Sequence, residues 1–479
     1  MSEFETGRDY KTIMIAVVVI AIIAVGGIAG FILLGGGGST TTTTEPEGLT
    51  LTILTRHDVA IHNVFEPAFL ASDEAEATGI TDILWKTPAE AFWDDLLELG
   101  QADVCWGGGP TLFDQIMRDD YLSTWDTPGL LAAAATVNDT LAGADMKRYD
   151  GDDLKWVAAA ISTFGFTVNH QFLDDYSLPT PSTWTDLANT TYGNLLPAIP
   201  TIAMGNAPDT TSNTRIYQII TQALGWDAGW INIARMAGSS NIYTGSVETQ
   251  QAAERGDVGI AMSIDFYGYL SQYRNPDCEY ILPEGQSIVN GDPIAIAETS
   301  SHKDLAEVFV EFVLSDYGQS LWLDASISRM PVRIGAFDSP GAPQDLKSVY
   351  TQTVNTVGIE FNDTLTLYQN TALLKYFEAV FTDAHTELRQ CWGAIVGAFY
   401  DGHISAAQVD TYADLMGIPV TIQDPNTSTM EKFTLAYAME INNDLIYNSD
   451  FGNSMQSLWT AAAKAQYLDV YNQIQALLP

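Results

Sequence analysis

The stretch Ala102–Arg118 reads ADVCWGGGPTLFDQIMR and has the local pattern of a strand that turns directly into a helix. Its first five residues, mostly apolar, form a short predicted strand, and Thr111–Arg118 has the apolar spacing of a helix. The glycines between them permit a sharp turn in which the backbone can approach a ligand closely. No G-K-[ST] sequence follows and no G-x-G-x-x-G pattern is present, so neither nucleotide-binding motif is matched.

The residues before this stretch alternate in the same way. Leu49–Leu54 (LTLTIL) and Thr81–Trp85 (TDILW) are predicted strands, and Pro88–Leu99 opens with proline and acids, as the first turn of a helix does. Alternation of strands and helices with short turns predicts a parallel, doubly wound α/β sheet.

The alternation continues through the middle of the chain and then stops. Trp156–Ile161, Phe164–Asn169 and Val258–Ser263 are predicted strands. Beyond about residue 342 the sequence holds long helical patterns, for example Ser457–Leu478, and little strand signal. The tail is therefore predicted to be a helical extension.

The N-terminal segment Ile13–Leu34 contains no charge and no proline. At about 1.5 Å per residue it is long enough for a hydrocarbon core of about 30 Å, which predicts a retained transmembrane anchor. Arg8 and Lys11 precede it, so residues 1–12 are expected in the cytoplasm and the rest of the chain outside the cell. A cleaved signal peptide is the alternative. Residues 35–48, rich in Gly and Thr, are expected to form a flexible linker.

The composition excludes several kinds of partner. With 20 Lys and Arg against 60 Asp and Glu, the net charge is -40, which excludes nucleic acid and argues against anionic lipid as a partner. The simplest interpretation of this acidity is that the charged side chains lie on a solvated surface. The three cysteines have no C-x-x-C spacing, and a Cys278–Cys391 bridge is left open.

Several polar groups follow predicted strands and are candidates for ligand contact. His57 and Asp58 follow the first strand, and Asp265 and Tyr267 follow Val258–Ser263. A metal site at His57 and His62 would need further ligands from elsewhere in the fold. No G-x-S-x-G sequence occurs, and the acidic pairs are sequence neighbours that point apart, so nothing indicates an enzyme.

A series of segments, in this order, resembles one known family. They are LTILTRHD, ADVCWGGGPTLFDQIM, STFGFTVNHQFLDDYSLPTPSTWTDLA, ERGDVGIAMSIDFYGYL and SRMPVR. Together they resemble the extracellular solute-binding proteins of ABC importers, with the type 2 periplasmic-binding fold, in the subgroup that includes ferric-ion binders. The anchor and linker are similar to those that hold archaeal binding proteins at the cell surface.

The resemblance implies two hinged α/β lobes with the ligand between them. Residues 49–155 plus 292–345 are expected to form lobe one, and residues 160–285 lobe two. Residues 346–479 are expected to be helices packed on lobe one. The implied function is capture of a small solute and its delivery to an ABC permease by a monomeric surface protein. The alternatives are a surface α/β hydrolase and a sensing or adhesion module without transport.

The resemblance also implies a set of ligand-binding residues. They are His57, Asp58, Gly107, Gly108, Gly109, Thr163, Phe164, Thr211, Ser212, Asn213, Asp265 and Tyr267. For Thr211, Ser212 and Asn213 the alternative is ordinary capping of a helix. No catalytic residue and no cofactor are expected.

The resemblance leaves the ligand open. Ferric binders carry two adjacent tyrosines where this chain reads Asp265-Phe266-Tyr267, so only one tyrosine falls on the matching pair. A ferric ion and an anionic or polar organic ligand, such as a phosphonate, polyamine or thiamine, therefore both remain candidates.

Overall fold

Strand β1 (Leu49–Thr55) lies between β2 (Ile80–Lys86) and β3 (Val104–Trp106) and pairs parallel with both. Helices α2 (Val59–Leu70) and α5 (Pro110–Arg118) follow β1 and β3 along the chain. The alternation of strand and helix therefore produces parallel pairing here, as the sequence predicted.

The computed structural model describes residues 48–355 and 358–479, and residues 48–479 form one compact unit. Within these residues, no helix combines the length and the apolar character that crossing a bilayer requires. The predicted anchor Ile13–Leu34 and residues 35–47 of the predicted linker lie outside the described part of the chain.

Strand β7 (Asp153–Asn169) is one continuous strand where the sequence predicted two, Trp156–Ile161 and Phe164–Asn169. It is buried along nearly its whole length, and it pairs antiparallel with β12 (Val289–Ile296) and with β10 (Ile260–Ile264). Backbone hydrogen bonds on both sides hold the central residues extended, which removes the predicted break.

The partner of β7 changes between two adjacent residues. Val289 of β12 pairs with Thr163, and Ile264 of β10 pairs with Phe164. The strand order is β2-β1-β3-β12-β7-β10-β8-β9, so β7 and β12 link two halves of the sheet.

The second half of the sheet repeats the first. β8 (Ile202–Gly205) lies between β10 and β9 (Ser240–Tyr243) and pairs parallel with both. Helices α10 (Thr211–Ala223), α11 (Trp226–Gly238) and α12 (Ser246–Glu254) surround these strands. Each half is thus a parallel group with one antiparallel strand at the linking edge.

The remaining elements are short or lie outside the two groups of parallel strands. The helices are α3 (Asp73–Thr78), η1 (Glu90–Phe92), α4 (Trp93–Glu98), α6 (Pro128–Ala135), α7 (His170–Asp175), α8 (Trp184–Leu187), α9 (Thr190–Gly193), η2 (Ala207–Asp209), α13 (Asp265–Arg274), α14 (Lys303–Leu314), α15 (Asp316–Leu321), η3 (Ile334–Asp338), α16 (Gln344–Asn355) and η4 (Glu378–Thr382). The strands are β4 (Thr140–Leu141), β5 (Ala144–Asp145), β6 (Lys147–Asp150), β11 (Cys278–Ile281), β13 (Met330–Pro331), β14 (Thr421–Gln423) and β15 (Met430–Lys432).

Two large hydrophobic cores correspond to the two halves of the sheet. One is built on β1, β2 and β3 and includes residues of α14, Trp322 and Tyr350; we call the elements around it the first lobe. The other is built on β8 and β10 with α10 and α11, and we call the elements around it the second lobe.

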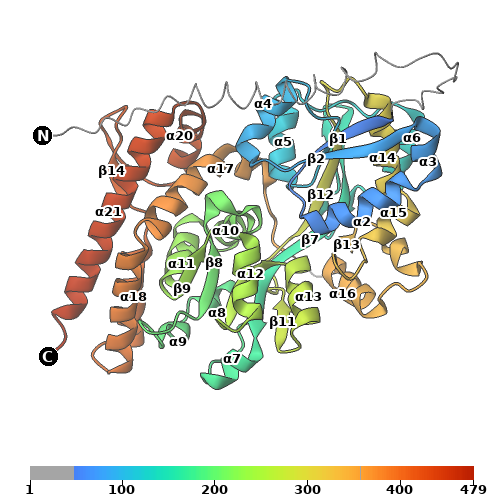
Figure 1. The fold of residues 1–479 in the computed structure, drawn as a ribbon. Helices are drawn as coiled ribbons and strands as arrows, with labels where there is room; N and C mark the ends of the chain where they lie inside the picture. Colours follow the sequence, from blue (N-terminus) through green and yellow to red (C-terminus); the bar gives the residue numbers. More distant parts are fainter. Residues whose placement is uncertain (1–47, 356–357) are drawn as a thin grey trace, which may run out of the picture. The chain divides into compact units, whose positions relative to one another are not determined.

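The helices after residue 362 share the core of the second lobe. They are α17 (Asp363–Phe377), α18 (His385–Tyr400), α19 (Ala406–Gly417), α20 (Leu435–Tyr447) and α21 (Ser449–Gln475). In Figure 1 these orange and red helices lie beside the green α10 and α11, away from the blue β1 and α2. The helices of residues 363–479 therefore share their core with the second lobe and not, as expected, with lobe one, although α17 also contacts α5 of the first lobe.

Aromatic contacts explain this packing. Tyr217 of α10 stacks on Phe377 of α17, with ring centroids 4.3 Å apart. Trp392 of α18 is fully buried, and its indole N–H donates to Ser239 Oγ at 2.8 Å at the end of α11. The apolar pattern of the tail predicts helices with one buried face, but it does not indicate which lobe that face contacts.

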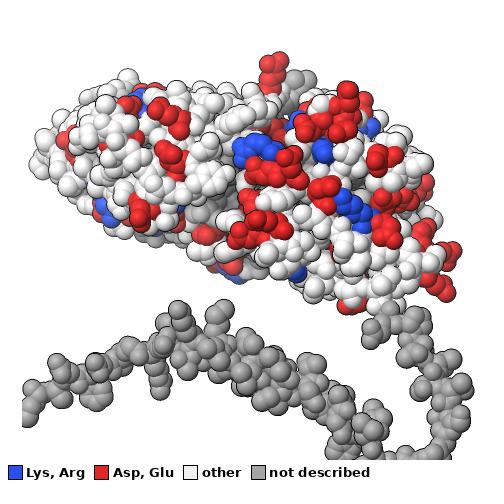
Figure 2. Space-filling view, turned by 90° about the horizontal axis from the view of Figure 1, so that it is seen from above, with Lys and Arg blue, Asp and Glu red and all other residues white. Residues whose placement is uncertain are grey.

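The acidic residues are spread over the surface. Figure 2 shows Asp and Glu scattered across one face, with fewer Lys and Arg among them. The cysteines Cys105, Cys278 and Cys391 are buried free thiols, so the Cys278–Cys391 bridge is not formed. Burial raises the pKa of Cys278 to about 11 and that of Cys391 to about 12, so both are protonated at neutral pH.

Candidate functional site

The loops after β1 and β3 meet in the first lobe and leave no room for a side chain at Gly107. A Cβ atom there would lie 2.2 Å from His57 Nε2, and the φ angle of Gly107 is +75°. At Gly108, with φ +111°, a Cβ atom would lie 2.8 Å from Leu112 Cδ2 and 3.1 Å from Arg56 Cγ. These two positions require glycine both for conformation and for space.

The side chain of His57 makes its polar contact within the first lobe. Its Nε2 lies 2.7 Å from Asp292 Oδ2, and Arg329 Nη2 lies 3.0 Å from the same oxygen. The backbone N–H of Gly108 also donates to Asp292. We call His57, Asp292 and Arg329 the buried charge cluster, because each is less than 10 % exposed.

The charges within this cluster follow from its surroundings. Burial lowers the pKa of His57, and Asp292 opposes that shift only in part, so the ring is neutral and donates through Nε2. Burial alone would raise the pKa of Asp292, but Arg329, His57 and their hydrogen bonds hold it below its usual range. Asp292 is therefore the counter-ion of the buried Arg329.

Asp58 caps the first turn of α2. Its Oδ1 accepts the backbone N–H of Ala60 at 2.9 Å, and the residue is exposed at the surface. The carboxylate therefore occupies the positive end of α2. The N–H of Ala60 is therefore not available to an anionic ligand.

Thr163 of β7 is hydrogen-bonded to Asp265, the first residue of α13. The N–H of Thr163 donates to Asp265 Oδ2 at 2.9 Å, and Thr163 Oγ1 lies 3.3 Å from the same oxygen. Asp265 is 1 % exposed, and burial raises its pKa to about 7 although Arg329 and these hydrogen bonds oppose the shift. The side chain of the neighbouring Phe164 lies in the core of the second lobe. The pair Thr163–Asp265 therefore lies where β7 changes partners.

Replacing Asp265 with asparagine should change how stability depends on pH. The folded protein holds a proton on Asp265 between about pH 4 and 7, where the unfolded chain has released it, so stability is lost as pH rises through that window. Asn keeps the acceptor for Thr163 and cannot ionise. Relative to wild type, Asp265→Asn should gain about 2–3 kcal/mol between pH 5 and 8, measured by calorimetry.

Asp152→Asn is the matched control, because it makes the same change of charge in an exposed turn. Parallel stability curves for wild type and Asp265→Asn across pH 5–8 would contradict the assignment of this titration to Asp265.

The N-terminal turn of α10 carries Thr211, Ser212 and Asn213. In the described chain no side chain caps this helix. Ser212 Oγ lies 2.8 Å from Ser246 Oγ of α12, and Asn213 Oδ1 accepts the N–H of Gly205 at 2.9 Å. The Nδ2 of Asn213 is buried and has no partner among the described residues. This turn therefore holds hydrogen-bond donors that the fold itself does not use.

Tyr267 packs against the core of the second lobe and is influenced by charges of the first. The sequence placed Asp265, Phe266 and Tyr267 in a turn after the strand, and the structure places them in the first turn of α13. Burial and the nearby Asp58 raise the pKa of Tyr267 to about 12, while Arg329 and Arg56 act in the opposite direction. Asp58 and Arg56 belong to the first lobe, so charges of that lobe act on Tyr267.

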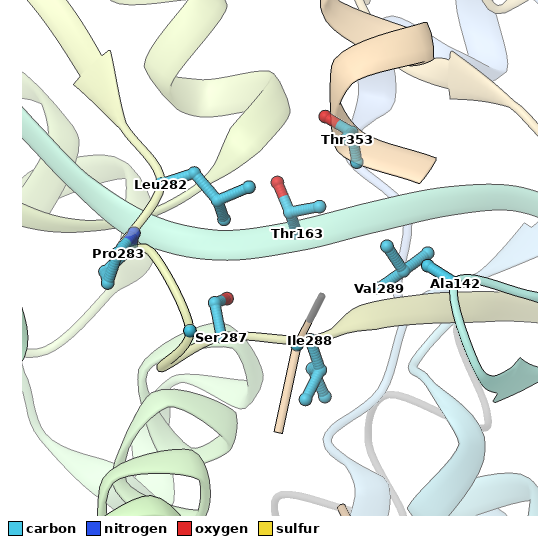
Figure 3. A pocket seen from close by; sticks show the side chains of 10 residues that line it. Ala142, Thr163, Leu282, Pro283, Ser287, Ile288, Val289 and Thr353 are labelled. Atoms are coloured by element: carbon cyan, nitrogen blue, oxygen red, sulfur yellow. The ribbon is translucent and has the colours of Figure 1, made fainter. Parts of the chain in front are cut away.

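A cavity lies beside the linking strands (Figure 3). Its lining includes Thr163 of β7, Ser287 just before β12, Val289 of β12 and Thr353 of α16, and it has room for little more than one water molecule. Of the predicted ligand-binding residues, Thr163 alone lines it. The cavity is thus separate from the turn at Thr211–Asn213.

The structure brings together two groups of predicted residues. His57, Gly107 and Gly108 meet in the first lobe, and Thr163 meets Asp265. Sequence reasoning missed Arg329 and Asp292 because they lie far along the chain from His57, although Arg329 lies within the quoted SRMPVR. In residues 48–355 and 358–479, no three His, Cys, Asp or Glu side chains are arranged to hold a metal ion.

Comparison with known proteins gives the family. A family model described as "Bacterial extracellular solute-binding protein" matches residues 109–363, just over half of the chain. The chain belongs to this family. Solute-binding proteins of this kind serve ABC transporters, bind small ligands outside the cytoplasm and are transport proteins, not enzymes.

Relatives and solved structures agree with the family. The phosphoglycerate transport regulatory protein PgtC of Salmonella typhimurium is 26% identical over 245 residues, which cover 50% of this chain and 57% of PgtC, so the match spans little more than half of that relative. The periplasmic binding protein AfuA of Actinobacillus pleuropneumoniae, solved with fructose-6-phosphate, has a TM-score of 0.57 at 15% identity over 70% of this chain and 98% of AfuA.

A third similar protein is the GacH receptor of Streptomyces glaucescens, which was solved unliganded and with acarbose. It has a TM-score of 0.54 at 15% identity, and the match covers 69% of this chain and 92% of the receptor. At this level of identity the two structural matches show the fold. The predicted α/β class and the type 2 periplasmic-binding fold are thereby confirmed.

Proposed function

We propose that this solute-binding protein is a cell-surface receptor that captures a small organic anion between its two lobes and delivers it to an ABC permease. In this proposal the N-terminal segment Ile13–Leu34 anchors the chain, and residues 48–479 lie outside the cell. Membership of an extracellular solute-binding family supports the location and the transport role.

The N-terminal turn of α10 is the observation that carries the choice of an anion. The helix has 13 residues, its first N–H groups have no side-chain cap within the described chain, and Thr211 is exposed. The end of such a helix attracts negative charge and offers donors to a phosphate or carboxylate. The unused amide of Asn213 adds a donor beside this turn.

Two observations favour an organic anion over a ferric ion. Phe266 stands where a second tyrosine would be needed, and its ring lies 4.8 Å from the guanidinium carbon of Arg329. The raised pKa of Tyr267, about 12, opposes formation of the phenolate that would bind iron. PgtC is named for phosphoglycerate, and AfuA was solved with fructose-6-phosphate. Both compounds are organic phosphates, which supports testing that class first.

Thermal unfolding of the full chain in mild detergent tests the proposal. Phosphoglycerate, fructose 6-phosphate, an alkyl phosphonate, spermidine, thiamine, glucose and a ferric salt are added in turn. A ligand at one hundred times its Kd stabilises the folded form by about 2.7 kcal/mol, so the melting temperature should rise by several degrees with a phosphorylated compound.

Thr211→Asp should abolish that rise without harming the fold. An acidic side chain at the start of a helix stabilises it, but here it also places a negative charge where the ligand anion would lie. Thr211→Asn is the matched control and should keep at least part of the response. A shift with the ferric salt alone that is lost in Tyr267→Phe would replace the organic anion with iron.

A further inference from the structure

Asp363, the first residue of α17, lies between arginines of both lobes. Arg215 of α10, in the second lobe, donates through Nη2 to Asp363 Oδ1. Arg148 of β6, in the first lobe, has its Nη2 3.9 Å from Asp363 Oδ2. The side chain of Arg215 is 8% exposed and that of Asp363 is 25% exposed, so this carboxylate is partly shielded from water. A residue of the helical extension thus contacts a cation of each lobe.

Arg215 and α17 make further contacts with the first lobe and the linking strand. Arg215 Nη1 donates to Thr111 Oγ1 of α5 at 3.2 Å, and Nη2 donates to Asn290 Oδ1 of β12 at 2.7 Å. Thr366 Oγ1, one helical turn after Asp363, lies 3.2 Å from the same Thr111 hydroxyl. Separation of the lobes at α5 and α10 would break the two contacts with Thr111.

The residues before α17 hold it in this place. The N–H of Ile359 donates to Ser287 O at 3.1 Å, beside the start of β12. The ring of Phe361 lies 4.1 Å from the guanidinium carbon of Arg215, a cation–π contact. Asn362 caps α17 through its Oδ1, which accepts from Leu365 N at 2.9 Å. Asp363 therefore approaches Arg215 from a segment that is itself fixed at the linking strands.

We propose that Asp363 is an interlobe clamp through which the helical extension holds the lobes together when no solute is bound. Loss of its charge leaves the guanidinium of Arg215 buried without a carboxylate partner, and opening of the lobes is the movement that returns water to it. A receptor that is closed before binding loses less affinity to the closing step than one that is mostly open. This inference rests on the proposed solute-binding function.

Spin-label distance measurements on the ligand-free full chain test the clamp. Labels are attached at Glu98→Cys in α4 of the first lobe and Gln171→Cys in α7 of the second, both exposed positions. The native cysteines are buried. The parent should give a single distance, and Asp363→Asn should add a longer one, with the open-to-closed ratio rising about tenfold, as expected for loss of a charged hydrogen bond.

Two further variants complete the test. Asp444→Asn makes the same change of charge on an exposed face of α20 and should keep the parent distance. Thr366→Val, which removes only the hydroxyl contact with Thr111, should shift the same ratio in the same direction and serves if Asp363→Asn does not fold. An unchanged distance in folded Asp363→Asn, or an open parent, would overturn the clamp.

The measurement needs no solute, so it remains decisive if no compound of the panel binds. If a solute is found, Asp363→Asn should weaken its binding by the factor by which the closed fraction falls. Solute binding that is unaffected while the lobes open would leave the proposed function intact and overturn the role of the clamp in it.

Discussion

Asp292→Ala is expected to lower the stability of the protein by about 3–5 kcal/mol, the usual cost of removing one partner from a buried ion pair. Asp292 is the carboxylate that pairs with Arg329 at 3.0 Å and accepts from His57 at 2.7 Å. Alanine leaves a guanidinium that is 5% exposed without its counter-ion. Calorimetry of the full chain should show the melting temperature falling by roughly 3–6 °C.

A double variant separates the charge effect from simple loss of packing. In Asp292→Leu with Arg329→Met both charges are replaced by apolar groups, and such replacements of buried pairs cost far less than removal of one partner. The double variant should therefore be more stable than Asp292→Ala. A melting temperature of Asp292→Ala within 2 °C of wild type would show that water reaches the cluster and that the pair is not buried in solution.

Trp392→Ala is expected to destabilise the second lobe by about 3–5 kcal/mol, because truncation of a buried aromatic residue removes packing and leaves a cavity. Trp392 belongs to α18, yet a Cβ atom placed on Gly238 of α11 would lie 2.7 Å from its Cβ. Its indole also donates to Ser239. Amide hydrogen exchange should therefore speed up in α11 as well as in α18, while β1 keeps the protection of wild type.

Leu468→Ala on α21 is the control, since this side chain is 52% exposed and its loss should change stability by less than about 0.5 kcal/mol. Faster exchange confined to α18 after Trp392→Ala would mean that the extension and the second lobe unfold independently. That result would contradict a shared core.

The parallel strands of the first lobe could be predicted from sequence because their signal is local. LTLTIL alternates, TDILW is a short strand-like run, and ADVCW runs into three glycines, so the pattern itself gives β1, β2 and β3 to within a residue or two. The continuous β7 could not be predicted in this way. Ser162, Thr163 and Gly165 suggest a break, and only the ladders with β12 and β10 hold them extended.

The candidate site likewise has parts that could be predicted from the sequence and parts that could not. Glycines and N-terminal helix residues stand next to strands in the sequence, so the turns at Gly107 and Thr211 were found. The bonds that fix the site join residues far apart, such as His57 with Asp292 and Arg215 with Asp363. No spacing rule connects such positions, because the contact exists only after both lobes and the extension have formed.

The core shared by the second lobe and the extension has a consequence for synthesis of the chain on the ribosome. Strand β10 ends at Ile264, while the last buried residue of the same core is Ile474, about 210 residues later. At a synthesis rate of about 5–20 residues per second, the apolar surfaces of α10 and α11 stay uncovered for roughly 10–40 s, until the helices that cover them have been made. During that interval the nascent chain exposes an apolar, aggregation-prone surface, and a chaperone would have to shield it.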